Sequence, residues 1–419
     1  MAGDSLSPFS PAVRAWFESS FPEPTAAQAQ AWGPISAGEN TLLCAPTGSG
    51  KTLAAFLWAI DSLGARSVQA SDQSGSASES GSPSEPGSPS EPGAGVRVLY
   101  ISPMRALAVD VEKNLQSPLR GVALAAQRLG LEFVAPTVGV RTGDTTATER
   151  RALVRTPPDI LITTPESLYL MLTSAARESL VSVDCVILDE IHALAPTKRG
   201  AHLSLSLERL EYLRTARDQT RRKLQRIGLS ATQRPLEAVA AFLGGFTPSD
   251  QAPIQRPVTI VDAGMRKELE LSVVVPVPEL DAGSGSAWPS MDAELLKLIE
   301  ENRSTLLFVN ARRMAERLAS RLNELAAEQG SHEPEALATD GESEELVKAH
   351  HGSLSRERRL VVEDELKRGQ LKGLVATSSL ELGIDMGAVD LVIQVASPGS
   401  VSAGLQRIGR AGHQVAVAS

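Results

Sequence analysis

The sequence is poor in cysteine: its 419 residues include only two, Cys44 and Cys185, each inside a short apolar run. Two such cysteines exclude a disulfide framework and a cysteine-based zinc site, and they favour buried thiols in a reducing compartment. No apolar run approaches the roughly 18 residues that a membrane span needs, and Met1 to Ser10 lacks the basic and apolar segments of a secretion signal. We therefore expect a cytoplasmic protein with no membrane partner.

An excess of positive charge is also absent. The chain has 41 Lys and Arg residues against 50 Asp and Glu residues, for a net charge of −9. This balance argues against a protein that coats nucleic acid by bulk electrostatics, but it allows a local basic groove. The hydrophobic fraction of 42% is normal for a globular protein, and the length favours two domains or more.

The strongest local signal is the octapeptide A-P-T-G-S-G-K-T at Ala45 to Thr52. It follows a strand-like run, Thr41 to Cys44, and precedes a helix-like run, Leu53 to Leu63. A glycine-bearing turn between a strand and a helix aims backbone N–H groups and the positive helix end at one point, which suits a nucleotide phosphate. The pattern departs from G-x-x-x-x-G-K-[ST] at Ala45, and a chance Gly/Ser turn is the alternative interpretation.

Each side chain of this loop has a predicted role. Gly48 and Gly50 let the backbone approach the phosphates, Lys51 supplies a cation, and Thr52 offers a hydroxyl to magnesium. The nucleotide-binding residues predicted in this loop are Thr47, Gly48, Ser49, Gly50, Lys51 and Thr52.

A Pro-Thr turn with a glutamine lies about twenty residues upstream, at Phe21 to Gln28. The Gln28 amide offers both a donor and an acceptor, which matches the edge of adenine. The alternative is an ordinary helix start, with Thr25 as N-cap and Gln28 as its capping-box partner. Both interpretations can hold together.

Repeated strand-like and helix-like runs predict an α/β protein with mostly parallel sheets and helices on both faces. The expected strands are Val96–Ile101, Val138–Arg141, Asp159–Thr163, Cys185–Leu188, Gln225–Leu229, Thr305–Val309, Val347–His350, Leu374–Ala376 and Leu391–Val395. The expected helices are Arg105–Asn114, Ala201–Ala216, Arg312–Ala327 and Arg356–Arg368, with Ser355 as an N-cap. We place the domains at 1–255 and 256–419, with a β-like run at Leu269 to Val275.

One segment interrupts the first domain. Residues Ser67 to Gly95 are rich in Ser, Gly, Pro and Glu, and S-P-S-E-P-G occurs there twice in tandem. Such a composition cannot offset the entropy of ordering, so we predict a disordered surface insertion at 67–95.

An acidic pair follows the strand Cys185–Leu188. Asp189 is placed to hold magnesium opposite Thr52, and Glu190 can act as a general base toward the attacking water. His192 and the hydroxyls of Ser230 and Thr232 are predicted to sense this carboxylate loop. Those hydroxyls are equally suited to capping the helix that starts near Leu236.

Other strand ends carry residues suited to gripping backbone phosphates near helix N-termini. These predicted nucleic-acid contacts are Pro103, Arg105, Thr142, Gly143, Thr164 and Pro165. Ordinary hydroxyl caps are the alternative. In the second domain, Arg407 and Arg410 are expected on one side of a helix, where forked guanidinium groups can grip the γ-phosphate. A basic surface face is the alternative for that pair.

Together these stretches resemble the motifs of a superfamily 2 DEAD/DEAH-box (DExH) helicase. The Q motif is Phe21 to Gln28, motif I Ala45 to Thr52 and motif Ia Ser102 to Leu107. Motif Ib is Thr164 to Leu168, II Asp189 to His192 and III Ser230 to Thr232. Motif IV is Phe308 to Arg313, V Ala376 to Asp385 and VI Gln406 to His413. Within the superfamily the resemblance is greatest to the large helicase-related (Lhr) group. It rests on the stretches D-E-I-H, V-R-T-G-D, H-H-G-S-L-S-R-E-R-R and R-I-G-R-A-G-H.

The resemblance implies two tandem RecA-like domains, with ATP and Mg²⁺ as cofactors. It adds Gly383 and Asp385 to the nucleotide site, and Arg312 and Thr377 to the nucleic-acid contacts. It also implies 3′ to 5′ movement on single-stranded DNA, unwinding of DNA or RNA:DNA duplexes, and a role in DNA repair. Because that family continues past motif VI, we expect the chain to be the motor core of a longer protein or a truncated product. Oligomeric state is left open.

Three alternatives stand beside this interpretation. The Q motif and S-A-T also suit a DEAD-box RNA helicase, although His192 replaces the final Asp of that family. A nucleotide-gated clamp with little turnover is opposed by Glu190 and both arginines. A scaffold built on the Ser/Pro segment predicts that deletion of Ser67 to Gly95 abolishes function.

Overall fold

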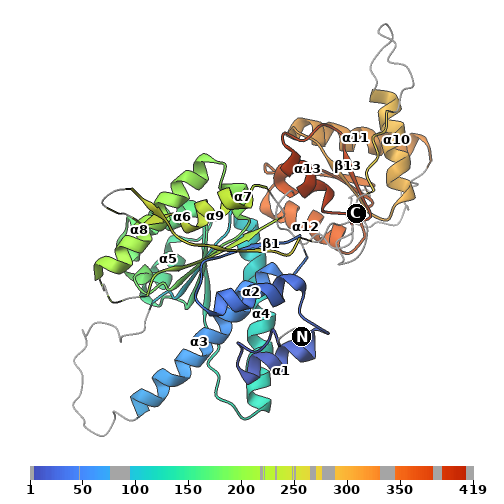
Figure 1. Cartoon of the computed structure of the whole chain (residues 1–419). Helices are drawn as coiled ribbons and strands as arrows, with labels where there is room; N and C mark the ends of the chain where they lie inside the picture. Colours follow the sequence, from blue (N-terminus) through green and yellow to red (C-terminus); the bar gives the residue numbers. More distant parts are fainter. Residues whose placement is uncertain are drawn as a thin grey trace. The chain divides into compact units, whose positions relative to one another are not determined.

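The chain divides into two compact units, Met1–Met265 and Arg266–Ser419 (Figure 1). The computed structural model describes residues 4–46, 48–75, 95–217, 220, 222–231, 234–247, 249, 252–264, 270–275, 288–330, 345–380 and 389–411. The division falls ten residues after the expected 255/256 boundary. The reason is strand β9 (Thr259–Asp262), which pairs in parallel with β1 (Thr41–Cys44) and so belongs to the first sheet.

The first unit is built on a parallel sheet with the strand order β3-β4-β2-β5-β6-β1-β9. The remaining strands of this sheet are β2 (Val98–Ile101), β3 (Val138–Arg141), β4 (Ile160–Thr163), β5 (Cys185–Leu188) and β6 (Gln225–Ser230). A separate antiparallel pair joins β7 (Phe246–Thr247) to β8 (Ile254–Gln255). The expected strands of this half are therefore confirmed, with ends that differ by at most two residues.

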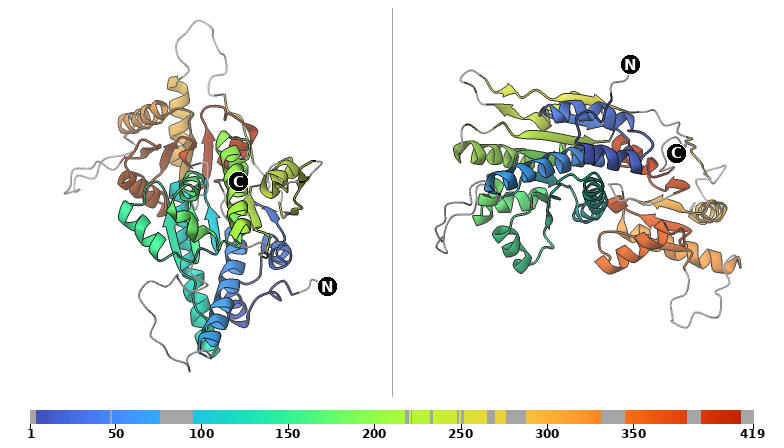
Figure 2. Two further views of the ribbon diagram at one scale, coloured as in Figure 1. Left: turned by 90° about the vertical axis from the view of Figure 1, so that its left-hand side faces the viewer. Right: turned by 90° about the horizontal axis from the view of Figure 1, so that it is seen from below.

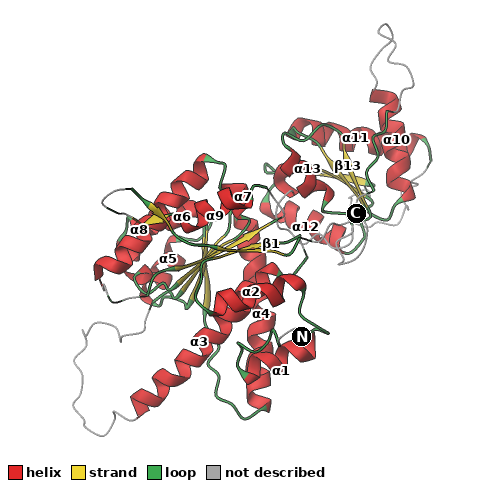
Figure 3. Ribbon diagram, in the orientation of Figure 1, coloured by secondary structure: helices red, strands yellow, loops and turns green. Residues whose placement is uncertain are grey.

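Alternation along these strands sends neighbouring side chains to opposite layers. Leu43 and Tyr100 pack with α2, α3 and α4, whereas Leu42 and Leu99 pack with α6, α7, α8 and α9. Figure 3 shows helices on both sides of this sheet. The helices are α1 (Pro11–Ser20), α2 (Ala26–Ser36), α3 (Lys51–Gly75), α4 (Arg105–Arg128), α5 (Ala147–Arg155), α6 (Pro165–Leu172), α7 (Ile191–Leu194), α8 (Lys198–Arg217) and α9 (Leu236–Gly244), with a 3₁₀ turn η1 (Ala175–Leu180).

Two helices, α3 and α4, extend more than ten residues beyond their expected ends. Helix α3 continues to Gly75, so the first nine residues of the predicted disordered segment 67–95 are helical, and residues 76–94 lie outside the described chain. Ala and Gln are strong helix formers, and they carry the helix into the segment until the Gly, Ser and Pro content rises. Helix α4 likewise runs to Arg128, well beyond the expected end at Asn114.

The second unit, drawn in orange to red in Figure 2, holds a smaller parallel sheet. The order of its strands is β11-β12-β10-β13. Its strands are β10 (Thr305–Phe308), β11 (Val347–His350), β12 (Gly373–Ala376) and β13 (Leu391–Gln394). Its helices are α10 (Trp288–Glu301), α11 (Arg312–Glu328), α12 (Arg356–Lys367) and α13 (Val401–Ile408), with a 3₁₀ turn η2 (Ser378–Leu380). Helices α10 and α11 share one core cluster with Leu307, and α12 shares another with Leu306.

One expectation for a connecting segment is wrong. Residues 270–275, within the expected β-like run, have no regular structure, and Val273 among them is 90% exposed. Cys44 is a buried free thiol as expected, but Cys185 is only partly buried. Within the described residues, no helix combines the length and the apolar character that crossing a membrane requires.

Candidate functional site

The phosphate loop lies at the carboxyl end of β1, directly before α3. Gly48 and Gly50 have φ values of 80° and 78°, a left-handed conformation that glycine adopts without strain. The Lys51 ammonium is largely buried and donates to the carbonyls of Ala45 and Pro46 at 2.6 and 2.7 Å. The backbone carbonyls of the loop therefore hold the Lys51 ammonium in this structure. Thr47 lies outside the described residues.

The segment that carries Gln28 contacts this loop directly. Thr25 and Gln28 form a complete capping box at the start of α2, so the helix-start interpretation is confirmed. The Thr25 hydroxyl also donates to the Ser49 carbonyl at 2.8 Å, and Gln28 Nε2 reaches the Gly50 carbonyl at 3.5 Å. Gln28 is 3% exposed. The capping box thus braces the loop, and recognition of adenine by Gln28 stays a prediction.

The acidic pair lies at the end of β5, as predicted. Asp189 is buried, and burial together with the neighbouring Glu190 charge raises its pKa to about 7. Tyr100 on β2 donates its phenol proton to Asp189 Oδ2 at 2.5 Å. Glu190 adopts φ 46°, the only positive φ of a described residue other than glycine. A left-handed backbone at a residue other than glycine is strained, and such strain is concentrated at functional sites, where surrounding contacts hold the residue in place.

His192 links the acidic pair to the end of β6. Its Nδ1 accepts the Ala231 N–H at 3.2 Å and lies 3.3 Å from the Ser230 hydroxyl. Nε2 therefore carries the proton, and it faces Glu190 Oε2 at 3.3 Å. Burial lowers the pKa of His192, although the Glu190 charge opposes this shift. The neutral imidazole thus joins the general-base candidate to the Ser-Ala-Thr segment.

The outcome for that segment is mixed. Ser230 does contact the carboxylate loop through His192. It does not cap α9, because Pro235 is the N-cap of that helix and no side chain of a described residue caps it. Thr232 lies outside the described residues, so its coupling role stays a prediction.

Three strand ends bring together the predicted phosphate-gripping residues. Arg105 pairs with Asp144 at 2.5 Å, and the Thr142 hydroxyl accepts the Asp144 N–H at 3.2 Å. Arg150 donates to the Gly143 carbonyl at 3.2 Å. Arg105 and Gly143 are exposed and can reach a nucleic-acid strand, whereas Thr142 is buried.

The neighbouring strand end shows helix capping. The Thr164 hydroxyl caps α6 by accepting the Ser167 N–H at 3.4 Å, and Pro165 occupies the first turn. Arg199 was not predicted, yet it bridges the Pro103 carbonyl at 2.9 Å and Glu166 at 2.6 Å. Pro103, Thr164 and Pro165 are all buried. Their contact with phosphates stays a prediction.

In the second unit, Arg407 lies in α13 but Arg410 lies in the turn after it, because α13 ends at Ile408. The expectation that both lie on one helix is therefore wrong. Arg407 donates to Asn310 Oδ1 at 3.3 Å and to Gln394 Oε1 at 3.1 Å, and it stacks 5.1 Å from the centre of the Phe308 ring. Both arginines are more than nine-tenths buried, which excludes the surface-face alternative.

Two further predicted contacts lie at neighbouring strand ends of this unit. Arg312 begins α11 and donates to the Ser353 hydroxyl at 2.6 Å, and the Thr377 N–H donates to the His350 carbonyl at 3.3 Å. Gly383 and Asp385 lie outside the described residues. Asn310, Gln394 and Ser353 were missed, although Asn310 stands two residues before Arg312 in the sequence.

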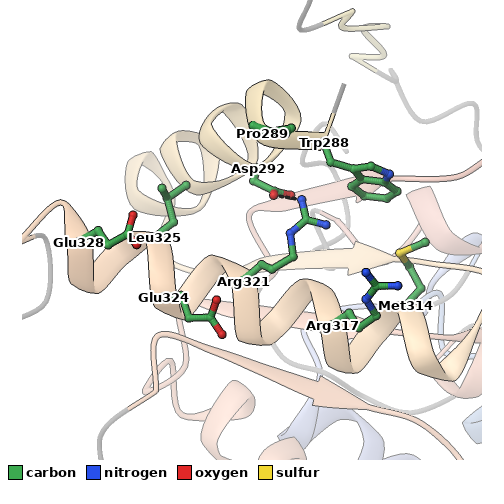
Figure 4. A pocket seen from close by; sticks show the side chains of 9 residues that line it. All are labelled: Trp288, Pro289, Asp292, Met314, Arg317, Arg321, Glu324, Leu325 and Glu328. Carbon is green, nitrogen blue, oxygen red and sulfur yellow. Dashed lines mark ion pairs between the residues drawn. The ribbon is translucent and has the colours of Figure 1, made fainter. Parts of the chain in front are cut away.

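A pocket of about 500 Å³ opens between α10 and α11. Arg321 lies there between Asp292, its ion-pair partner, and Trp288, whose ring centre is 4.9 Å from the guanidinium carbon (Figure 4). None of the predicted site residues lines this pocket. The described residues also contain no group of three or more His, Cys, Asp or Glu side chains that would hold a metal.

Comparison with known protein families accounts for both units. The DEAD/DEAH box helicase profile matches residues 25–239, and the helicase conserved C-terminal domain profile matches residues 291–414. The chain belongs to the DEAD/DEAH box helicases. This is a family of ATP-hydrolysing enzymes, and the membership confirms the helicase interpretation of the motifs.

Individual proteins refine this membership. The chain is 52% identical to the Lhr helicase/probable uracil glycosylase of Mycolicibacterium smegmatis, over 98% of this chain and 26% of that protein. It is 47% identical to the Lhr helicase/uracil glycosylase of Escherichia coli, over 97% of this chain and 26% of that protein. It thus spans about a quarter of the length of these curated relatives. The predicted similarity to the Lhr group is confirmed.

Solved structures support the fold. A structure of Mycobacterium smegmatis helicase Lhr bound to ssDNA and AMP-PNP matches with a TM-score of 0.78 and 53% identity, over 99% of this chain and 47% of that one. The DEAD-box helicase Mss116 matches with a TM-score of 0.68 at 18% identity, over 98% of this chain and 72% of that one, which shows the fold alone. The expected RecA-like fold of the two units is confirmed.

Proposed function

We propose that the chain is the motor of an Lhr-type helicase that hydrolyses ATP to move along single-stranded DNA. We further propose 3′ to 5′ movement, separation of DNA or RNA:DNA duplexes, and a role in DNA repair. The observation that carries the proposal is the Asp189–Glu190–His192 arrangement at the carboxyl edge of the sheet that bears the phosphate loop. A relative 53% identical to this chain binds ssDNA and AMP-PNP, which supports the choice of ligands.

The residues of the first unit fit a nucleotide with magnesium. Thr52 and Asp189 both approach the Tyr100 phenol, so a hydroxyl and a carboxylate oxygen lie near one point. Magnesium prefers one or two such protein ligands and completes its shell with waters and phosphate oxygens. The ion would supply charge neutralisation and orientation of the phosphates.

Each side chain then has a defined task. Lys51 exchanges its loop carbonyls for phosphate oxygens when ATP enters, while the N–H groups around Gly48, Ser49 and Gly50 bind the phosphates. Glu190 accepts a proton from the attacking water. Because His192 Nε2 faces Glu190 while its Nδ1 is fixed by Ala231, we propose that the histidine reports the state of the acidic pair to the Ser230 segment.

The arginines of motif VI complete the proposed chemistry. We assign to Arg407 and Arg410 the stabilisation of negative charge that develops on the γ-phosphate. Asn310, Gln394 and Phe308 hold the Arg407 guanidinium in place, so its orientation is set before the reaction. Thr47, Gly383, Asp385 and Thr232 keep the roles that the motifs assign to them.

The nucleic-acid strand is proposed to cross the ends of β2, β3 and β4 and, in the second unit, the starts of α11 and η2. Arg105, Gly143 and Arg312 offer exposed groups, and Thr142, Thr164 and Thr377 support the loops behind them. The net charge of −9 means that affinity comes from a few placed contacts.

The test uses single strands and tailed duplexes. ATPase activity is measured with DNA or RNA strands of one length, and unwinding with 3′- or 5′-tailed duplexes whose displaced strand is DNA or RNA. The proposal expects stimulation by DNA and displacement only from 3′-tailed substrates. Stimulation by RNA alone would instead identify a DEAD-box-type RNA helicase, and tight strand binding without turnover would identify a clamp.

A further inference from the structure

Tyr100 is a fully buried tyrosine on β2, an inner strand of the first sheet, and its hydroxyl group has no role in the motifs described above. Its ring stacks on Phe56 of α3 with 4.8 Å between ring centres and 23° between planes. A phenylalanine would pack equally well there. The buried hydroxyl must therefore find polar partners to offset its desolvation.

Its hydrogen-bond partner is Asp189, one of the two residues proposed to hold magnesium. The phenol donates to Asp189 Oδ2 at 2.5 Å, and Thr52 lies near the same phenol. Sheet order explains the contact with Asp189. Strand β2 pairs with β5 so that Tyr100 lies beside Ile187, and the long phenol side chain reaches past the end of β5 to the carboxylate.

The second Asp189 oxygen is also fixed. Oδ1 accepts the N–H of Glu190 at 2.9 Å, so both carboxylate oxygens are held by groups on the protein. Outer-shell hydrogen bonds of this kind set the orientation of a metal ligand, and their loss typically costs 10- to 100-fold in metal affinity or activity.

We propose that Tyr100 is a positioning residue for the magnesium site: its hydroxyl orients the Asp189 carboxylate, which is proposed to hold magnesium together with Thr52. This inference rests on the proposed function, because it takes Thr52 and Asp189 as the magnesium-side residues. Tyr100 does not touch the reacting atoms. Its removal should change the magnesium requirement and leave binding of the nucleotide alone unchanged.

The test is Tyr100→Phe, which keeps the stack on Phe56 and removes only the hydroxyl. Binding of a fluorescent ATP analogue is titrated at increasing Mg²⁺, and again in EDTA. We expect the half-saturating Mg²⁺ concentration to rise on the order of tenfold, with affinity in EDTA unchanged. The matched control is Tyr212→Phe, because Tyr212 on α8 is 75% exposed. This variant should leave the half-saturating Mg²⁺ concentration and the affinity in EDTA as in the wild type.

A double variant separates positioning from packing. In an Asp189→Asn background the further change Tyr100→Phe should not move the half-saturating Mg²⁺ concentration, because the carboxylate that the phenol positions is gone. An unchanged Mg²⁺ requirement in Tyr100→Phe, even with lower thermal stability, would overturn the inference, as would an equal shift in both backgrounds. If the wild type showed no Mg²⁺-dependent nucleotide binding, the proposed function would fail and the inference with it.

Discussion

Gly50 offers a test of how the capping box of α2 braces the phosphate loop. Its φ is 78°, and a Cβ added there would meet Gln28 Nε2 at 2.4 Å. Gly50→Ala therefore has two costs. An L-residue in the left-handed region costs roughly 1–2 kcal/mol, and moving the Gln28 side chain out of its capping box costs about 1 kcal/mol more.

The two costs can be separated by measurement. Urea unfolding of the nucleotide-free protein should show a loss of about 2–3 kcal/mol for Gly50→Ala in the wild type. In a Gln28→Ala background the collision is absent, so the same change should cost only about 1–2 kcal/mol. Gly38→Ala is the matched control, since Gly38 has φ 80° and no atom within 4 Å of an added Cβ. It should cost the same in both backgrounds.

The reasoning would be refuted by a Gly50→Ala cost that is equal in the two backgrounds. That result would mean that Gln28 does not press against the loop in solution. A Gly50→Ala cost no larger than that of Gly38→Ala would lead to the same conclusion.

Three further predictions follow from the site and the core. Arg407→Ala should slow nucleic-acid-stimulated ATP hydrolysis by roughly 10³-fold or more with little change in ATP affinity. Arg407→Lys should not restore the rate, because lysine cannot reproduce the paired contacts and the stack on Phe308. A loss confined to ATP affinity would contradict this prediction. Asp61 is buried, and burial raises its pKa. The folded state therefore binds more protons than the unfolded state, and stability falls as the pH rises above the pKa that Asp61 has in the unfolded chain. Asp61→Asn should therefore raise the Tm near pH 7.5, with the gain shrinking toward pH 4, and a gain that grows on acidification would reverse the sign. Finally, single-strand affinity should decrease only shallowly with salt, because few phosphates are neutralised; a slope typical of a polybasic binder would show a wider footprint than Arg105 and Arg312 provide.

The strands and the position of the acidic pair could be predicted because their signals are local. Most core strands are short, largely apolar runs next to Gly, Pro or polar residues, and the expected bounds of Val138–Arg141, Cys185–Leu188 and Val347–His350 equal the observed ones. Asp189 and Glu190 follow such a run directly, so their position at the sheet edge followed from the alternation alone.

The missed contacts depend on tertiary structure. Tyr100 reads as an ordinary core residue of a strand, and only the pairing of β2 with β5 brings its phenol to Asp189. Arg199 reaches Pro103 and Glu166 across 96 and 33 residues of sequence. The partners of Arg407 come from two different strand ends, a grouping that no spacing in the sequence reveals.

The central claim is that the chain turns over ATP with Glu190 as the general base, and Glu190→Gln tests it most directly. Bound and hydrolysed ATP are measured in the same samples with single-stranded DNA present, and Lys51→Ala serves as the comparison that removes binding. The account predicts that Glu190→Gln binds ATP as the wild type does but shows almost no hydrolysis, because Asp189 and the phosphate loop remain while the proton acceptor is lost. Turnover by Glu190→Gln within a few-fold of the wild type would contradict it.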